Sequence, residues 1–218
     1  GLKRLKEYSL PRDAVSRVSR KEICEYGEAT DRFRIAAIDC GMKNNIPRSL
    51  IKRGCRVIAL PWNTSAEDIL ALKPDGIFIS NGPGDPKENA GCIAEIQKLL
   101  GQKPMFGICL GHQLTALAMG GDTVKLKYGH RGGNQPVRDM ETGRTWITSQ
   151  NHGYAVVAGS LKGVGKETFV NANDQSCEGM AYPEKNCFTV QFHPEACSGP
   201  LDTRFLFDRF ITMMGGEN

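Results

Sequence analysis

Between residues 33 and 119, short apolar runs alternate with longer segments that suit helices. Apolar runs of this length, bounded by glycine, proline or charged side chains, are typical of fully buried strands. They predict strands at 33–39, 56–60, 76–80 and 105–108, separated by helices near 44–53, 64–72 and 89–100 and followed by one at 114–119. Such alternation is typical of parallel βαβ units in an open sheet covered by helices.

From residue 123 onward the pattern changes to short strands separated by turns. Strands are predicted at 123–128, 136–140, 145–150, 154–158, 168–171, 178–182 and 187–192. A closing helix is predicted at 201–214, with an apolar face of Leu206, Phe207, Phe210 and Ile211. The expected fold is therefore α/β: an open, mostly parallel central sheet with helices on both faces plus a small antiparallel sheet.

Residues 1–32 are charged and contain few large apolar side chains. Pro11 interrupts them, and short helical turns are predicted around 13–20 and 21–26. We interpret 1–32 as a linker or interdomain arm and 33–218 as one domain. Near the start of the second predicted helix, Thr64 and Glu67 have the spacing of a capping box with Thr64 as N-cap.

Composition and charge exclude several classes of protein. The 218 residues carry a net charge of +4, and the basic residues form no stripe interleaved with aromatic side chains, so we expect no nucleic-acid partner. No apolar run approaches membrane-spanning length and no signal peptide opens the chain. We therefore expect no membrane association and a cytoplasmic location.

Eight cysteines are present, and none belongs to a CxxC pair or to a Cys/His set with zinc spacing. No metal site is predicted. An even number of cysteines leaves a disulfide framework open, but the length and the α/β pattern favour reduced thiols.

Cys109 is the strongest candidate for a nucleophile. It lies between a predicted strand and a predicted helix, with Gly107 and Gly111 two residues away on either side. This spacing is typical of a nucleophile elbow, where glycines permit a sharp turn. A helix N-terminus also favours the thiolate form of a cysteine. The alternative is a buried structural cysteine.

A base and a group that orients it are predicted at a second strand end. His193 follows the apolar strand 188–192, and Glu195 lies two residues further on. Cys109, His193 and Glu195 can then form a triad in which the carboxylate holds the imidazole. The alternative is a simple turn with a satisfied histidine. His112 is predicted to point away from the thiol, because it lies three residues into the helix.

The loop 80–86 contains two glycines and follows a third strand end. One of its backbone N–H groups can pair with that of Leu110 to stabilise a tetrahedral oxyanion. A plain turn and a phosphate-binding loop are the alternatives, although the absence of a following Gly-Lys-Ser/Thr excludes a Walker A motif.

Taken together, these motifs resemble those of class I (triad-type) glutamine amidotransferases over residues 33–214. The motifs are 106–113, 80–86, Asn151-His152-Gly153 and His193-Pro194-Glu195. Within the family, the segments 125–137 and 41–46 are similar to those of the carbamoyl-phosphate synthetase small subunit. Glutaminases of anthranilate and GMP synthetases share the triad motifs but usually lack the Gly-His-Arg-Gly-Gly-Asn type of segment.

The resemblance implies a role for each matching residue. Cys109 would attack the glutamine carboxamide, while His193, oriented by Glu195, acts as acid and base. The N–H groups of Gly84 and Leu110 would form the oxyanion hole. The positions implied to contact glutamine are Gly82, Gly84, Leu110, Gln113, Asn151, Gly153 and Tyr154. Tyr154 stands where the family often has Phe.

The resemblance also implies a reaction and a partner. L-glutamine would yield L-glutamate and ammonia through a γ-glutamyl thioester on Cys109. The ammonia would pass to a carbamoyl-phosphate synthetase large subunit, for arginine and pyrimidine synthesis. No cofactor is expected in this chain, and ATP, magnesium and bicarbonate are expected only on that partner. The segment 125–137 would be a surface facing the synthetase or a solvated loop, without a catalytic role.

Two alternatives remain at this point. One is the glutaminase component of another synthase, and the other is a non-catalytic scaffold domain of the same fold. The family's small subunit carries an N-terminal domain that supplies a serine contact to glutamine. Only about 32 residues precede the matching domain here, so the glutamine site is expected to be incomplete.

Overall fold

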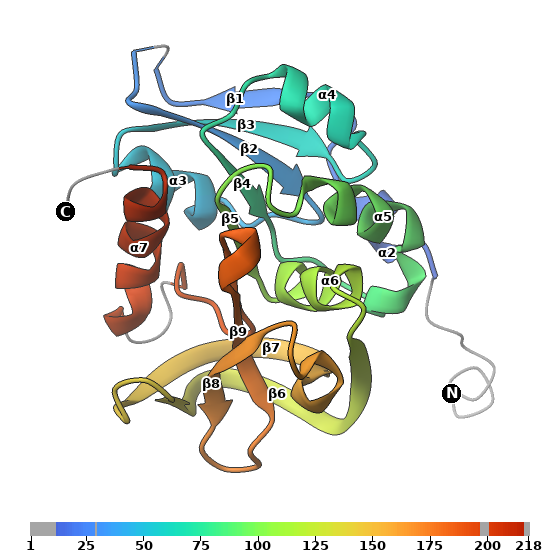
Figure 1. Ribbon diagram of the computed structural model, residues 1–218, viewed down its shortest axis with the longest axis vertical. Helices are drawn as coiled ribbons and strands as arrows, with labels where there is room; N and C mark the ends of the chain where they lie inside the picture. The colour runs from blue at the N-terminus through green and yellow to red at the C-terminus, as the bar shows by residue number, and fades with distance from the viewer. Residues whose placement is uncertain (1–11, 29, 197–200, 216–218) are drawn as a thin grey trace, which may run out of the picture.

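The computed structural model describes residues 12–28, 30–196 and 201–215. Its strands form one ten-stranded sheet in the order β1-β3-β2-β4-β5-β10-β9-β7-β6-β8 (Figure 1). Five neighbouring strands run parallel: β3 (Cys55–Pro61), β2 (Phe33–Asp39), β4 (Gly76–Ile79), β5 (Met105–Ile108) and β10 (Cys187–Val190). The four strands predicted first are all present, each within a residue or two of its expected bounds.

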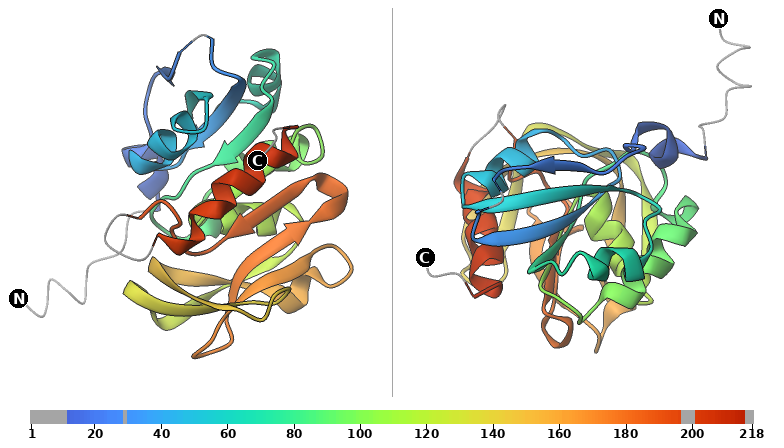
Figure 2. Two further views of the ribbon diagram at one scale, coloured as in Figure 1. Left: turned by 90° about the vertical axis from the view of Figure 1, so that its left-hand side faces the viewer. Right: turned by 90° about the horizontal axis from the view of Figure 1, so that it is seen from above.

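Helices cover both faces of the parallel half, as Figure 2 shows. One face carries α2 (Ala14–Val18), α4 (Ala66–Ala71), α5 (Ala90–Leu99) and α6 (Leu110–Ala118), and the other carries α3 (Asn45–Ile51) and α7 (Phe205–Met213). Successive strand residues therefore face different cores: Ile38 packs with the first set of helices, and Ala37 with the second.

The core beneath α7 is aromatic. The ring centroids of Phe78 and Phe106 lie 5.2 Å apart in a T-shaped pair, and those of Phe106 and Phe188 lie 4.4 Å apart in a stack. Phe207 and Phe210 of α7 pack against the same cluster. The predicted apolar face of α7 is thus confirmed, since all four of its members are buried.

Four further strands form the antiparallel half: β6 (Asp122–Asp139), β7 (Thr145–Val157), β8 (Lys166–Asn171) and β9 (Cys177–Tyr182). This half occupies the lower part of Figure 1 and joins the parallel half through the antiparallel pairing of β9 with β10. The predicted fold class is confirmed. The antiparallel sheet continues the main sheet.

Four predicted short strands are fused in pairs. β6 joins the strands predicted at 123–128 and 136–140 and ends at residue 139, and β7 joins those predicted at 145–150 and 154–158 and ends at residue 157. The part of β6 between its two predicted strands, residues 129–135, shows no alternation of hydrophobic and polar side chains, so its pairing depends on backbone hydrogen bonds. Register shifts interrupt the β6–β7 pairing between Lys125 and His130 and between Gly132 and Gln135.

The N-terminal segment packs onto the domain. The turn predicted at 13–20 is α2, whose Val15 is buried, but the helical turn predicted at 21–26 is wrong. Residues Cys24–Tyr26 form β1, an edge strand antiparallel to β3, because backbone pairing with that open edge outweighs local propensity. Residues 1–11 lie outside the described part, and a role as an interdomain arm stays a prediction.

The predicted capping box is displaced by one residue. Ser65 is the N-cap of α4 and accepts a hydrogen bond from the N–H of Asp68, whereas the Thr64 hydroxyl donates to the carbonyl of Pro61. In the part of the chain that the structure describes, four short 3-10 helices complete the elements: η1 (Pro86–Glu88), η2 (Ala158–Leu161), η3 (Pro183–Lys185) and η4 (Asp202–Arg204).

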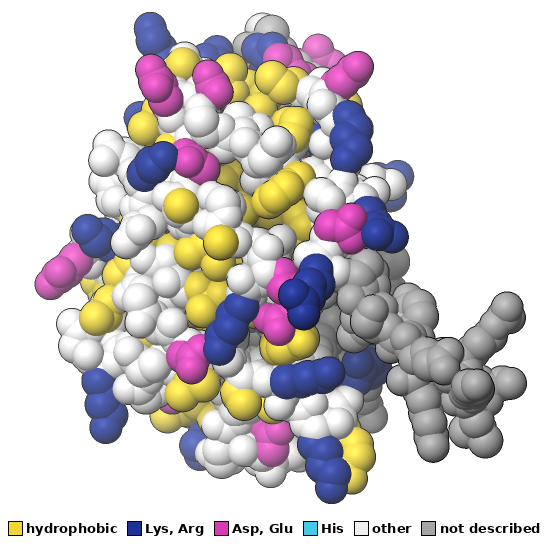
Figure 3. Space-filling view, turned by 90° about the vertical axis from the view of Figure 1, so that its right-hand side faces the viewer, with side chains coloured by type: hydrophobic (Ala, Val, Ile, Leu, Met, Phe, Trp, Pro, Cys, Tyr) yellow, Lys and Arg dark blue, Asp and Glu magenta, His cyan; other side chains and the backbone are white. Residues whose placement is uncertain are grey.

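Two surface properties bear on partners. No helix in residues 12–28, 30–196 and 201–215 combines the length and the apolar character needed to cross a membrane. On the face in Figure 3, acidic and basic side chains are interspersed rather than gathered by sign.

Candidate active site

Cys109 lies at a sharp turn between β5 and α6, where its φ is +56° and its ψ is −103°. Both flanking glycines are required by close backbone contacts. A Cβ on Gly111 would lie 2.3 Å from the carbonyl oxygen of Ile79, and one on Gly107 would lie 2.9 Å from that of Gly111. The positive φ of a non-glycine residue is the strained geometry of a nucleophile elbow.

The second strand end lies beside the elbow. β10 pairs in parallel with β5 up to Val190 and Ile108, and the N–H of Cys109 donates to the carbonyl of Val190 at 2.8 Å. His193 follows β10, and its N–H donates to the carbonyl of Ser149 at 2.9 Å. The parallel register therefore brings His193 to Cys109.

Glu195 orients the imidazole of His193, as the spacing predicts. Nδ1 of His193 lies 2.8 Å from Oε1 of Glu195, and both residues are buried. Because a carboxylate accepts, Nδ1 carries the proton and Nε2 is left for the thiol. The structure thus brings Cys109, His193 and Glu195 together.

Charge on both sides holds a proton on His193. Burial lowers the pKa of its imidazole, but the charge and hydrogen bond of Cys109, together with Glu195, outweigh burial and raise it to about 10. For Glu195, burial raises the pKa, whereas His193 and the Lys43 ammonium lower it, and the net shift is downward. The Nζ of Lys43 lies 3.8 Å from Oε1 of Glu195.

Lys43 was missed as a site residue. It lies in the loop 41–46, which contributed to the resemblance but was given no chemical role. The structure places its ammonium beside the buried carboxylate of Glu195, and Asn45 donates to the backbone carbonyl of Glu195 at 3.3 Å. The sequence signal that pointed to Lys43 was its position as a basic residue shortly after the end of a predicted strand.

The loop 80–86 faces the elbow and is held by close packing. Ser80 accepts from the N–H of Cys40 at 2.9 Å and donates to the carbonyl of Asn81 at 2.8 Å. A Cβ on Gly82 would lie 2.2 Å from the Cys40 carbonyl, and Gly84 has a φ of +93°. Glycine is therefore needed at both positions.

A cavity of about 210 Å³ opens onto the thiol. Its lining is Gly82, Pro83, Gly84, Cys109, Gln113, Arg131, Asn151, His152, Gly153 and Tyr154. Every predicted glutamine contact except Leu110 is among them. Leu110 is the first residue of α6, so its backbone N–H has no partner within the helix and lies directly after Cys109.

Gln113 ties the elbow helix to β7. Its Nε2 donates to the carbonyl of Tyr154 at 2.8 Å and to Oε1 of Gln191 at 2.9 Å. His112, one residue earlier, points away from Cys109 as predicted, and its Nδ1 lies 2.8 Å from the hydroxyl of Thr189. Burial lowers the pKa of His112 to about 3, so this histidine is neutral.

Arg131 and His152 line the cavity although no role was predicted for them. Arg131 belongs to the segment 125–137, for which a synthetase-facing surface or a solvated loop without a catalytic role was predicted, and the structure adds that its side chain lines the cavity. The bulged pairing of β6 with β7 turns this side chain toward Gly153, a displacement that strand periodicity does not predict.

A candidate metal-binding cluster lies behind the cavity. His130, His152 and Glu178 place one ligand atom each within 4.8 Å of one another. The three residues lie on three strands and are far apart in sequence, so no spacing motif connects them. The larger hollow of about 800 Å³, at α7, contains none of the predicted site residues.

The cysteines of the described segments bear on the disulfide alternative. All seven of them, at positions 24, 40, 55, 92, 109, 177 and 187, are free. Cys197 lies outside the described residues. Reduced thiols at these seven positions agree with the expectation from length and pattern.

Comparison with known sequences gives a consistent picture. The family model for class-I glutamine amidotransferases matches residues 36–213. The carbamoyl phosphate synthase small chain of Listeria monocytogenes is 49% identical over 99% of this chain and 59% of its own length. The pyrimidine-specific small chain of Bacillus subtilis is 52% identical over 98% of this chain and 58% of its own length. The chain spans about three fifths of the curated relatives it matches.

Solved structures support the fold alone, because the identities are low. A putative GMP synthase protein from Thermoplasma acidophilum superposes with a TM-score of 0.74 at 23% identity, covering 84% of this chain and 94% of that one. A glutamine amidotransferase from Thermotoga maritima superposes with a TM-score of 0.61 at 16% identity, covering 85% and 86%.

Proposed function

Because this chain belongs to the class I glutamine amidotransferase family, we propose that it hydrolyses L-glutamine to L-glutamate and ammonia. One observation carries the proposal: Cys109, at a strained elbow beside the His193–Glu195 pair, opens into a cavity lined by polar backbone. A nucleophile, an oriented base and a place for the substrate are thereby combined.

The first half-reaction forms the thioester. The Cys109 sulfur attacks the carboxamide carbon, and the N–H groups of Gly84 and Leu110 stabilise the oxyanion. His193 gives its proton to the amide nitrogen, the C–N bond breaks, and ammonia leaves. In the second half, neutral His193 takes a proton from water, the hydroxide attacks the thioester, and the C–S bond breaks to release glutamate.

The cavity walls supply the proposed recognition of glutamine. The contacts are those implied by the resemblance: Gly82, Gly84, Leu110, Gln113, Asn151, Gly153 and Tyr154. Most of them act through backbone or amide groups, which suit a neutral carboxamide and an amino-acid backbone.

The finer proposal is that the ammonia serves a carbamoyl-phosphate synthetase large subunit, in arginine or pyrimidine synthesis. It is supported by about 50% identity to proteins named carbamoyl phosphate synthase small chain. ATP, magnesium and bicarbonate would bind on that partner, and this chain would use no cofactor of its own. A cytoplasmic location is part of the proposal, supported by the seven free cysteines.

Glutamate release from glutamine tests the proposal, with and without the large subunit. We expect Cys109→Ser to abolish the activity, because the hydroxyl is a far weaker nucleophile beside this base. Cys24→Ser is the matched control, since Cys24 lies on edge strand β1 at the far side of the sheet.

Activity that survives Cys109→Ser would contradict the mechanism. Activity that depends on Cys109 but does not respond to the large subunit would retain the glutaminase and reject the partner.

A further inference from the structure

His130, His152 and Glu178 converge in the antiparallel half, on β6, β7 and β9. His130 and His152 are direct partners in the β6–β7 pairing. Nδ1 of His130 lies 3.1 Å from Nε2 of His152 and 3.4 Å from Oε1 of Glu178. Glu178 is fully buried, and its other oxygen has no hydrogen-bond partner.

The second nitrogen of each ring fixes where its proton lies. Nε2 of His130 faces Oδ2 of Asp174 at 2.8 Å, and Nδ1 of His152 faces the carbonyl of Tyr154 at 2.8 Å. Carboxylates and carbonyls only accept, so both of these nitrogens carry protons. In the neutral rings, the lone pairs of the other two nitrogens then point at one another.

Gln150 adds a fourth electron-rich atom. Its Oε1 lies 2.9 Å from Nε2 of His152, and its Nε2 lies 3.1 Å from the hydroxyl of Thr148. The Thr148 hydroxyl donates to the carbonyl of Gln135, so it must accept from Gln150. If the Gln150 amide were turned by 180°, its oxygen would face the Thr148 hydroxyl oxygen, and both would be acceptors. The amide oxygen Oε1 therefore points toward His152 and the cluster.

We propose that this cluster is a binding site for a divalent first-row transition ion, with Zn²⁺ as the representative ion. Ligand atoms of tetrahedral Zn²⁺ with bonds of about 2.0–2.1 Å lie about 3.3–3.4 Å apart. Two of the three separations, 3.1 and 3.4 Å, are close to this spacing, and all three ligand atoms lie within 4.8 Å of one another. His130, His152 and Glu178 are the protein ligands, and Gln150 or water takes the fourth position.

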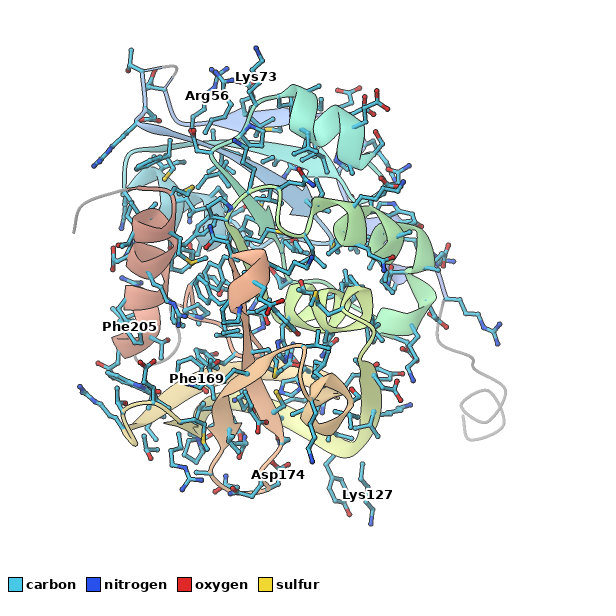
Figure 4. The ribbon with its side chains drawn as sticks, viewed as in Figure 1. Arg56, Lys73, Lys127, Phe169, Asp174 and Phe205 are labelled. Atoms are coloured by element: carbon cyan, nitrogen blue, oxygen red, sulfur yellow. The ribbon has the colours of Figure 1, made fainter. Side chains whose placement is uncertain are left out.

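The groups around the cluster resemble the outer shell of a metal site. Asp174 and the Tyr154 carbonyl orient the two rings, and the side-chain amide of Asn171 donates to Oε1 of Glu178 at 3.0 Å. Carboxylates and backbone carbonyls commonly hold metal-bound histidines in this way. Figure 4 shows Asp174 at the end of the molecule formed by the antiparallel strands.

A proton on Nδ1 of His130 is the competing solution. This proton would give a hydrogen-bond donor to both His152 and Glu178. However, Oε1 of Gln150 and the unprotonated Nε2 of His152, both acceptors, would still lie 2.9 Å apart. A metal ion satisfies all of these atoms at once. This difference favours the metal ion over the proton.

The ion would lie directly behind the proposed glutamine cavity. His152 is one of the cavity's lining residues, between Asn151 and Gly153. An ion bound to its Nε2 would hold this part of the wall in one position. Any effect on glutamine binding depends on the proposed function, whereas metal binding itself does not.

Co²⁺ absorption tests the site in the Cys109→Ser variant, where the triad cannot supply a thiolate. We expect one equivalent of Co²⁺ to give the visible bands of a tetrahedral nitrogen- and oxygen-ligated ion, and Zn²⁺ to displace it. His130→Asn should abolish the bands, and Asp174→Asn should weaken binding by roughly 10–100-fold.

Two further variants separate ligand loss from misfolding. Glu178→Gln keeps the acceptor for Asn171 but removes the charge, and it should weaken Co²⁺ binding while the circular dichroism stays unchanged. Glu141→Gln, at an exposed turn, is the matched control. No visible bands, a thiolate charge-transfer spectrum, or equal binding by all variants would overturn the proposal and leave a proton in the cluster.

Discussion

The proton on His193 is held by two neighbours that act in the same direction. Cys109 on one side and Glu195 on the other raise its pKa to about 10 despite burial. The imidazolium is therefore present throughout the neutral range, ready to protonate the amide nitrogen that leaves as ammonia. At this scale, residue spacing predicted the three triad members. A basic residue after a strand end pointed only weakly to Lys43, because its contact with Glu195 depends on how a loop folds.

Replacing Glu195 with Gln tests this balance. Without the carboxylate, the pKa of His193 should fall from about 10, so the alkaline limb of kcat/KM for glutamine should move to lower pH. The maximal rate should fall by on the order of 10²-fold, because the ring loses the group that orients it. A pH–rate profile measures both. An unchanged alkaline limb would exclude Glu195 as the group that holds the proton.

At the scale of elements, the elbow depends on how closely α6 approaches β4. Gly111 lies against the carbonyl of Ile79, and only a hydrogen fits there. The Gly-x-Cys-x-Gly spacing predicted the sharp turn, but not this contact with β4. The fusion of short strands into β6 was not predicted, because polar, glycine-rich stretches pair through backbone groups that leave no side-chain pattern.

We expect Gly111→Ala to destabilise the protein by about 1–3 kcal/mol, because its methyl would meet fixed backbone. Gly91→Ala on α5 is the matched control. Nothing lies within 4 Å of its Cβ position, so it should be neutral or stabilise by up to about 1 kcal/mol. Denaturant unfolding compares them. Equal stability of the two variants would contradict the close approach.

At the scale of the whole molecule, one sheet joins two halves of different character. The class of fold followed from the alternation of strands and helices. The position of β1 did not, because an edge strand of three residues is chosen by the free edge of β3 rather than by its own sequence. Arg131 likewise was not predicted to reach the cavity, because its orientation depends on the bulged pairing of β6 with β7.

Global stability should fall in acid because of His112. Its pKa is about 3 in the folded protein, where burial keeps it neutral, and about 6.5 in the unfolded chain. The unfolded state therefore binds the extra proton as the pH falls from about 6.5 to 3. The free energy of unfolding therefore falls by up to about 1.4 kcal/mol for each pH unit in this range.

Denaturant midpoints measured between pH 4 and 8 check this dependence, and His112→Gln should flatten it below about pH 6.5. The comparison uses slopes, so an overall loss of stability in the variant does not affect it. The same slope in both proteins would assign the acid sensitivity to other groups.

The parallel pairing of β5 with β10 sets unequal tolerances to changes in chain length. Only Gln191 and Phe192 separate the end of β10 from His193, so one residue inserted there would shift the base away from its place beside Cys109. The turn after β6, near residues 140–144, is exposed and far from the thiol, and it can absorb an insertion. Length variation in evolution or in design is therefore expected at that turn, and excluded from Gln191 and Phe192, the two residues between β10 and its base.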